Sequence, residues 1–592
     1  MSLRVRLGVP VLRSAIGLSL AVGLFGCGAT KSVGDDPTLD PDGGSTDGGA
    51  HFDIGGDGLP DPDGGAAFQD ITLDPSNATI YIDTATSPAT PATVTYKATL
   101  NNSDGTTKDV TSTIALTLDA TALGTFAGPT FTSVNKLPGT ALGVTTVVHG
   151  TADGKVGSAN LTIVQLRKTG DKRDFFFVEP YLGTPSPDRD VLKFGTNIKQ
   201  VDVAISMDTT GSMGGSIANL KTNIATTLLP ALVAAIPSVG MAIAYHDDYP
   251  TGSYGTPGCS FTGGVLPGDV PAGIIQLVTT DLPKAQAAAN KLETHCGGDG
   301  PEAQEPSMWH ILTGKELKWD TGTVPAHTPA PGTFGGVDFR PGSLPVVVEI
   351  TDVSWHDALK DPYGTDITAP PSLADLKTEF VKDNARFVDV TNGAFGAPED
   401  QANELSDGSK SNIPPAAFGA CPSAGTGPCC TGLSGAGRPA DGPAGSCRLN
   451  FLHSSGSGVS TSIVKAIQAI SVGSQFDVTA VASNDPTNPD GVDATKFIKA
   501  LRAMDEGDAA QGCPPHAAKD TNGDSIKDTF LAVVVGTPVC FEILPEKNST
   551  VPPKASAQFF NAFINVLGMP GSVKLDLRTV LFLVPPKEIT AF

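Results

Sequence analysis

Alternation of strand-like and helix-like segments between residues 199 and 472 constrains the fold of this chain more than any other feature. The strands are short and apolar, as in "VDVAISM" (201–207) and "LPVVVEITD" (344–352). The segment "SIANLKTNIATTLLPALVAAI" (216–236) instead has apolar residues at helical spacing. Because parallel strands need crossovers, which are usually helices, the pattern predicts an α/β domain with a doubly wound, mostly parallel sheet. Ligands of such sheets lie beyond the carboxyl ends of the strands.

Residues on both sides of this α/β segment read as strands and turns. In "ATVTYKATL" (92–100) apolar and polar residues alternate, which predicts one all-β sandwich at 68–167. The string "SDGTTKDVTSTIALTLD" resembles the bacterial Ig-like domains found in surface proteins. Because this part of the sequence has no cluster of titratable residues, a spacer or stalk is its expected role. A second sandwich is predicted at 473–592. Residues 168–198 connect the first sandwich to the α/β segment, and "DFFFVEPYLG" within them is expected to add a strand to a neighbour.

The N-terminus has the pattern of an export signal. Residues 1–26 combine arginines with an apolar run too short to span a bilayer, followed by Cys27. "LFGC" resembles the lipobox of bacterial lipoproteins, which implies lipidation of Cys27, anchoring by the lipid alone, and the outer membrane or cell surface as location. The alternative is an ordinary secretory signal. Residues 27–67 are rich in Asp and Gly and predict a disordered tether.

Charge and cysteine usage narrow the partners and the compartment. The chain has 62 acidic against 39 basic residues and a net charge of −23, so nucleic acid is not an expected partner. Eight cysteines remain besides Cys27, an even number that favours disulfides in an exported chain. Four of them, at 421, 429, 430 and 447, are expected to pair among themselves, and Cys513 with Cys540. Zinc is the alternative for the group of four, although its spacing lacks two CxxC pairs.

Oxygen-bearing side chains gather where the first predicted strand ends. Asp208, Thr210 and Ser212 follow "VDVAISM" at every second position, and Asp352 ends the strand at 344–352. Because parallel strands end at one edge of a sheet, these residues are expected to meet there. Such oxygens suit a hard divalent cation. The alternative is that they are ordinary capping and turn residues.

At these positions the chain resembles the von Willebrand factor A domain, whose metal-ion-dependent adhesion site reads Asp-x-Ser/Thr-x-Ser with a later Asp. "GGDGPE" (297–302) is similar to a block of the integrin β-subunit version, which adds a glutamate ligand. The resemblance implies a main site for Mg²⁺ or Mn²⁺, formed by Asp208, Thr210, Ser212, Glu302 and Asp352. It also implies a second, Ca²⁺ site formed by Asp247, Asp299, the Pro301 carbonyl and Glu302. Gly297 replaces an Asn ligand of that second site.

A further cation signal is "DTNGDSIKD" (520–528). Asp520, Asn522, Asp524, Ile526 and Asp528 occupy positions 1, 3, 5, 7 and 9 of a calcium loop, with Ile526 offering its carbonyl. Position 6 is not Gly and position 12 is not Glu, so a polar hairpin turn is the alternative. A calcium ion here would stiffen the loop.

The sequence therefore predicts a surface lipoprotein that binds a protein or matrix ligand, through a ligand carboxylate that joins the metal of the main site. An enzyme is not expected, because the chain has neither HExxH nor GxSxG. Two alternatives stay open. One is a structural or assembly module of the cell envelope without an open metal site, and the other is a metal-assisted envelope hydrolase.

Overall fold

The computed structural model describes residues 68–139, 141–169, 172–259, 266, 268–395, 398–419, 430–431, 437–452 and 458–587. The predicted signal peptide, Cys27 and the tether lie outside these residues. Within the described part of the chain, no helix is both long and apolar enough to cross a lipid bilayer.

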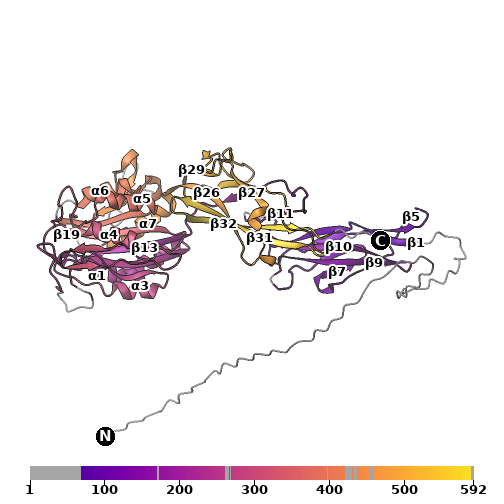
Figure 1. Ribbon diagram of the computed structural model, residues 1–592, viewed down its shortest axis with the longest axis horizontal. Coiled ribbons are helices and arrows are strands. Elements are labelled where there is room, and N and C mark those ends of the chain that lie inside the picture. Colours follow the sequence, from indigo (N-terminus) through magenta and orange to yellow (C-terminus); the bar gives the residue numbers. More distant parts are fainter. Residues whose placement is uncertain are drawn as a thin grey trace, which may run out of the picture. The chain divides into compact units, whose positions relative to one another are not determined.

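The predicted fold class, α/β with a doubly wound parallel sheet, is wrong. The chain is mostly β (Figure 1), with 39% strand and 20% helix. The described residues form nine sheets. The α-helices are short, from seven residues in α2 (Leu229–Ala235) to fifteen in α7 (Val459–Gly473). Alternation over less than half of the chain could not set the class, because most strands lie outside it or in its connections.

Residues 68–166 form the N-terminal β-module. Its strands are β1 (Phe68–Asp74), β2 (Asn77–Asp83), β3 (Thr93–Thr95), β4 (Lys97–Asn102), β5 (Thr107–Asp109), β6 (Ala115–Leu118), β7 (Gly124–Ala127), β8 (Thr130–Ser133), β9 (Gly143–Ala152) and β10 (Lys155–Leu166). In β4, Ala98 and Leu100 are buried while Lys97 is exposed, as the alternation of the sequence predicts. Strand β10 pairs in parallel with β2 and antiparallel with β9.

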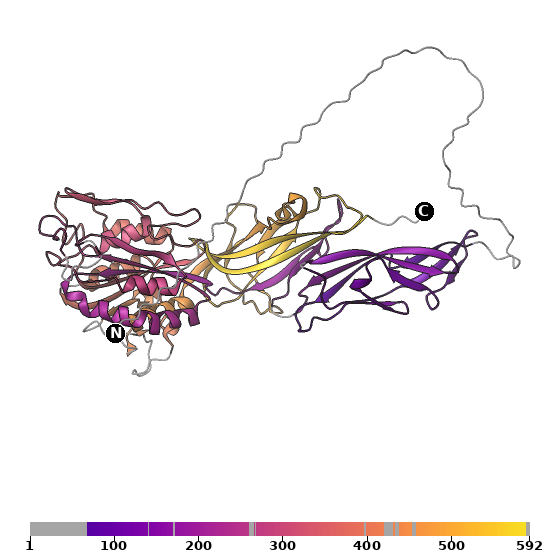
Figure 2. The same cartoon turned by 90° about the horizontal axis from the view of Figure 1, so that it is seen from below.

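A second set of strands forms the C-terminal β-module, which begins before the central part of the chain and ends after it. Its strands are β11 (Phe175–Val178), β12 (Asp190–Phe194), β26 (Gln475–Asn484), β27 (Ile498–Ala503), β28 (Ala518–Lys519), β29 (Thr529–Val534), β30 (Val539–Pro545), β31 (Gln558–Met569) and β32 (Val573–Val584). The long strands β31 and β32 lie side by side (Figure 2). Strand β11 pairs with β32, and β12 pairs with β30. The early strand in "DFFFVEPYLG" therefore joins a neighbouring sheet, as predicted.

Residues 199–473 form an inserted segment between β12 and β26. Its largest sheet has the order β15-β14-β13-β18-β20-β25, formed by β13 (Gln200–Asp208), β14 (Ser238–His246), β15 (Gly273–Thr279), β18 (Leu344–Val353), β20 (Arg386–Phe395) and β25 (Asn450–Leu452). The connections add β16 (Leu317–Trp319), β17 (Gly322–Val324), β19 (Ile367–Thr368), β21 (Asn412–Ile413), β22 (Cys430–Thr431), β23 (Gly437–Arg438) and β24 (Cys447–Arg448). Strand β13 lies between β14 and β18 and is parallel to both.

Alternate residues of β13 face two apolar cores. The remaining α-helices of the segment are α1 (Gly214–Asn223), α3 (Leu282–Ala289), α4 (Gln304–Thr313), α5 (Leu373–Lys382) and α6 (Pro398–Gly408). Ile205 belongs to the core that contains Leu220 of α1, whereas Ala204 belongs to the core that contains Phe380 of α5. Burial on both faces explains why this strand reads as a continuous apolar run. It also leaves the carboxyl end of the strand as the place for polar side chains.

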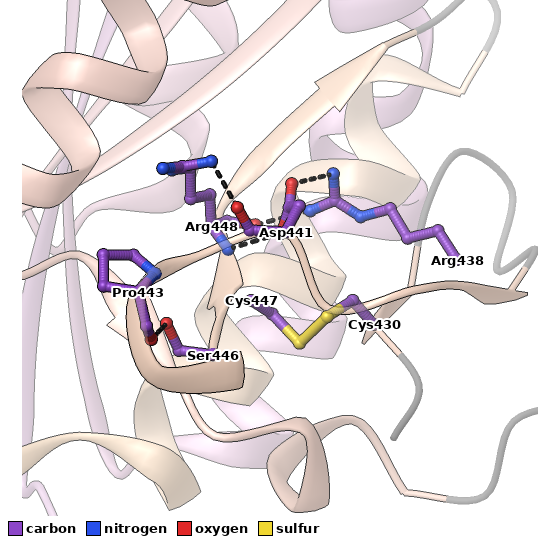
Figure 3. The surroundings of a disulfide bond; sticks show 7 residues. All are labelled: Cys430, Arg438, Asp441, Pro443, Ser446, Cys447 and Arg448. Carbon is purple, nitrogen blue, oxygen red and sulfur yellow. Dashed lines mark hydrogen bonds and ion pairs between the residues drawn. A yellow bond between two sulfur atoms is a disulfide. The ribbon is translucent and has the colours of Figure 1, made fainter. Parts of the chain in front are cut away.

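Three disulfides tie connections of the described chain. Cys513 pairs with Cys540, which confirms that prediction, and Cys259 pairs with Cys296. Cys430 pairs with Cys447 beside a cluster of charged residues, in which Arg438 donates to Asp441 (Figure 3). Residues 421 and 429 lie outside the described residues.

Candidate metal site

The carboxyl ends of three neighbouring strands supply the polar residues of the site. Asp208 is the last residue of β13 and pairs with His246, the last residue of β14. Asp352 lies near the end of β18, which pairs with β13 on its other side. The parallel register therefore brings together residues more than a hundred positions apart in the sequence.

Four of the five residues predicted for the main site line one cavity of about 360 Å³, and the fifth is bonded to one of the four. Thr210, Ser212, Glu302 and Asp352 line the cavity. Ser212 Oγ donates to Asp352 Oδ1 at 3.0 Å. Asp208 is fully buried, and its Oδ1 accepts from the amide and the hydroxyl of Thr210 at 2.9 and 2.7 Å. The carboxylates of Asp208, Glu302 and Asp352 do not form a group within 4.8 Å of one another. The hydroxyl-bearing residues Thr210 and Ser212 complete the cavity wall.

Thr351 is a part of the site that the sequence analysis missed. Its hydroxyl donates to Asp208 Oδ2 at 2.8 Å and accepts from Gln304 Nε2 at 2.9 Å. Both oxygens of Asp208 are thus engaged, which fixes the carboxylate behind Thr210. The sequence feature that could have identified it is its position directly before Asp352 in "ITDV".

Glu302 is the residue whose surroundings point most directly to a cation. Its side chain is 3% exposed, and Oε2 has no hydrogen-bond partner. Burial, followed by the nearby carboxylates of Asp208, Asp248, Asp247 and Asp299, raises the pKa of Glu302 well above its usual value. A buried carboxylate among four others is costly unless it is protonated or neutralised by a cation. The residues present therefore fit a divalent cation.

Gly297 stands beside this glutamate. Its φ is +69°, and a Cβ at this position would lie 3.0 Å from Glu302 Oε1 and 3.1 Å from Thr210 Cγ2. A side chain at position 297 would therefore press on the cavity wall, so glycine is required here for both conformation and space.

The residues of the predicted second site are distributed over two groups. Asp247 Oδ2 contacts His295 Nδ1 at 2.9 Å, and Asp269 completes this first group. Asp299 instead belongs to a second group with Asp248 and His356. Glu302 is in neither group. The structure thus does not bring the predicted calcium ligands together as one set, because the two aspartates after β14 enter different groups.

The first group is held by hydrogen bonds to the backbone. Asp269 accepts from the amides of Thr256, Cys296 and Gly297 at 2.7, 3.0 and 3.1 Å. Asp247 Oδ1 accepts from Thr209 Oγ1 at 2.7 Å. With its oxygens engaged in this way, the group fixes the loop that carries Cys296 and Gly297 against the end of β13.

The second group is an ion pair in which two of the facing atoms have no hydrogen bond. Asp248 Oδ1 accepts from Tyr363 Oη at 2.8 Å, whereas Oδ2 has no hydrogen-bond partner. His356 Nε2 lies 3.2 Å from that Oδ2 and 3.6 Å from Asp299 Oδ1, outside hydrogen-bond geometry. Burial lowers the pKa of His356, but the two carboxylates outweigh it and raise the pKa to about 10.

His246, the last residue of β14, serves a different purpose. Its Nε2 contacts Glu349 Oε1 at 2.7 Å, and both side chains are fully buried. Burial opposes the charge, but Glu349 raises the pKa of His246 to about 9. His246 and Glu349 lie on β14 and β18, the two strands that pair with β13. Neither residue lines the cavity. The histidines that do approach the acidic residues, His295 and His356, come from loops.

The predicted calcium loop at 520–528 joins β28 to β29, which pair as antiparallel strands. Asp520 accepts from the amides of Asn522, Gly523 and Ser525, which lowers its pKa. Asp524 accepts from the amide of Ile526, and Asp528 from Thr521. The three carboxylates do not form a group within 4.8 Å. Their oxygens thus stabilise the turn itself, which is the arrangement of the polar hairpin alternative.

Comparisons with known proteins add little to this geometry. No family model and no curated protein match the chain. Among solved structures, it is similar to the pilus adhesin SpaC from Lactobacillus rhamnosus GG in an open conformation, with 11% sequence identity and a TM-score of 0.26. The match covers 79% of this chain, which spans 55% of that adhesin chain. Such a similarity establishes neither a family nor a function, and the resemblance to the von Willebrand factor A domain is carried by the motif residues alone.

Proposed function

We propose that this chain is a surface adhesin that binds a protein or matrix ligand through a divalent cation, held in the cavity lined by Thr210, Ser212, Glu302 and Asp352. The observation that carries the proposal is the buried, unpartnered Oε2 of Glu302 in a wall of hydroxyl and carboxylate oxygens. Oxygen ligands of this kind suit Mg²⁺ or Mn²⁺. A lipid anchor at Cys27 and a location at the outer membrane or cell surface are part of the proposal.

The residues of such a site have different roles. Asp208 orients Thr210 through two hydrogen bonds, and Asp352 orients the hydroxyl of Ser212. Glu302 brings the charge that a cation would neutralise. When bound, a divalent cation would offer a position to a ligand carboxylate in a charge-assisted contact. The role is binding rather than catalysis.

Binding of Mn²⁺ by serine variants tests the cavity. Ser212→Ala removes a hydroxyl from the cavity wall, while Ser216→Ala makes the same chemical change at a buried residue of α1 that does not line the cavity. We expect Ser212→Ala to weaken Mn²⁺ binding at least about tenfold, which is the usual effect of removing a side chain that supports a metal site. Ser216→Ala should bind Mn²⁺ as tightly as the wild type. Electron paramagnetic resonance of free Mn²⁺ measures both. Equal binding by the two variants would contradict the proposed site.

Adhesion is tested with the full chain on immobilised envelope and matrix proteins. We expect binding in Mg²⁺ that is lost on addition of a chelator and in Asp352→Asn. Binding that chelator leaves unchanged would favour the assembly module without an open metal site. Hydrolysis of an ester, peptide or phosphate that Asp352→Asn abolishes would favour the hydrolase.

A further inference from the structure

We propose that Asp248, Asp299 and His356 form a second metal site that takes a d-block divalent cation such as Zn²⁺. The three residues follow β14, precede α4 and follow β18, so the site joins three separate segments. Their ligand atoms all lie within 4.8 Å of one another. The inference does not rest on the proposed function, since it uses none of the residues Thr210, Ser212, Glu302 and Asp352, although Asp299 lines the same cavity.

The hydrogen bond of His356 fixes the ring nitrogen that faces the group. His356 Nδ1 is 2.7 Å from the carbonyl oxygen of Asp361. A carbonyl only accepts, so Nδ1 carries the proton and donates. Nε2 faces the two carboxylates, and a cation that replaces its proton would bind to the lone pair there. A histidine held by a backbone carbonyl in this way is typical of metal ligands.

Asp248 is held in a corresponding manner. Its side chain is fully buried, and Oδ1 accepts from the backbone amide of Tyr249 at 2.6 Å and from the hydroxyl of Tyr363. Oδ2 has no hydrogen-bond partner and faces His356 Nε2. A buried carboxylate oxygen without a donor is costly, and coordination to a cation would satisfy it.

The distances and the access are those of a metal site. Ligand atoms about 2.1 Å from a zinc ion stand about 3.4 Å apart at tetrahedral angles, and the two contacts of His356 Nε2 measure 3.2 and 3.6 Å. Asp299 is partly exposed and lines the 360 Å³ cavity, which gives an ion a path to the group. One imidazole nitrogen with carboxylate oxygens favours Zn²⁺ or a similar ion over Mg²⁺ or Ca²⁺.

Binding at this site would fix the loop of Asp299 to the residues after β18. Asp248 and His356 are already anchored by Tyr363 and Asp361, whereas Asp299 is the partly exposed member. A metal would therefore act as a clamp on one wall of the main cavity.

Titration of Zn²⁺ into the chelator-stripped full chain, in excess Mg²⁺, tests the site by isothermal titration calorimetry. We expect the wild type to bind one Zn²⁺ that His356→Gln and Asp299→Asn each bind at least about tenfold more weakly. The second variant alters a partly exposed residue, so it separates loss of the site from misfolding. Anomalous scattering at the zinc edge would place the ion between the three residues.

Two matched variants locate the ion and separate this inference from the proposed function. His295→Gln alters the other acid–histidine group, and Asp352→Asn alters the main cavity, and we expect both to keep the zinc site. Absence of zinc binding by the wild type, or equal binding by His356→Gln, would show that the group is only an ion pair. Loss in His295→Gln alone would assign the ion to the other group. Zinc binding that survives in Asp352→Asn while adhesion is lost would uphold both proposals.

Discussion

At the scale of single residues, the adjacent aspartates 247 and 248 decide how charge is organised around the site. Successive residues of an extended chain point to opposite sides. Asp247 accordingly contacts His295, and Asp248 contacts His356. Each of these two aspartates thus contacts a different histidine. Glu302 lies among the carboxylates, and its Oε2 has no hydrogen-bond partner.

Glu305 provides a prediction on pH dependence. Its side chain is fully buried, both of its oxygens lack hydrogen-bond partners, and burial raises its pKa from 4.5 to about 9. The folded state thus holds a proton that the unfolded state releases above pH 4.5. The stability that this proton contributes is fully present below pH 4.5 and is lost progressively as the pH rises to about 9. We expect Glu305→Gln to make this loss of stability smaller and to raise stability at neutral pH.

Urea unfolding followed by tryptophan fluorescence measures the effect where it arises, because Trp309, Trp319 and Trp355 all lie in the inserted segment. The exposed Glu546 supplies a control, and Glu546→Gln should keep the pH dependence of the wild type. A pH dependence of stability in Glu305→Gln equal to that of the wild type would show that other groups cause it.

The sequence predicted which residues line the main cavity but not the grouping around them. Asp208 and Asp352 could be predicted together, because each ends a strongly apolar strand and parallel strands end at one edge. Nothing in the local pattern showed that Asp299 would join His356 rather than Asp247. That choice depends on the loops that carry His295 and His356, whose paths are fixed by tertiary contacts.

At the scale of elements, helix α5 shows how local sequence sets a boundary. Ser372 Oγ accepts from the amide of Asp375, and the Asp375 carboxylate accepts from the amide of Ser372. This capping box satisfies two backbone donors at the start of the helix. The buried face of α5, which includes Leu376 and Phe380, then packs in the core with Ala204 of β13.

Removal of that cap should destabilise the inserted segment. We expect Ser372→Ala to lower the free energy of unfolding by about 1 kcal/mol, because the amide of Asp375 loses its acceptor. Ser372→Thr keeps the hydroxyl and should stay close to the wild type. Denaturation followed by tryptophan fluorescence compares the three proteins, and an unchanged midpoint in Ser372→Ala would contradict the expected role of the cap.

Individual elements were predicted better than the fold class. The strands expected at 201–207 and 344–352 occur at Gln200–Asp208 and Leu344–Val353. The helix expected at 216–236 is instead interrupted by a π-helical turn at Ile224–Leu228. Pro230 follows that turn, and proline lacks the amide that a regular helix would use there. The fold class failed because strands in the connections and flanking modules outweigh the alternating pattern.

At the scale of the whole molecule, the inserted segment begins and ends beside one turn of the C-terminal β-module. Thr196 Oγ1 donates to the carbonyl oxygen of Thr537 at 2.8 Å, and the amide of Val535 donates to the carbonyl oxygen of Ser474 at 2.9 Å. Residues 196 and 474 thus both contact the link between β29 and β30. The module could not be predicted from local patterns, because its strands are separated by almost three hundred residues of sequence.

This arrangement predicts that the C-terminal β-module folds without the inserted segment. We expect a chain of residues 168–592, in which a short Gly/Ser linker replaces residues 199–473, to give a strand-rich circular dichroism spectrum and a cooperative thermal transition. The reason is that closing a short loop between adjacent ends costs little conformational entropy. A spectrum without a transition would show that the module depends on the inserted segment.

The two ends of the inserted segment, which lie beside the same turn, also determine how mechanical load would pass to the C-terminal β-module. Tension on a ligand held at the cavity would enter the β-module through two peptide connections at one place, rather than through a single linker. The load would then act along β12 and β26, whose hydrogen bonds to β30 and β31 resist sliding together. A chain connected in this way would distribute a pull over two sheets before any strand has to peel away.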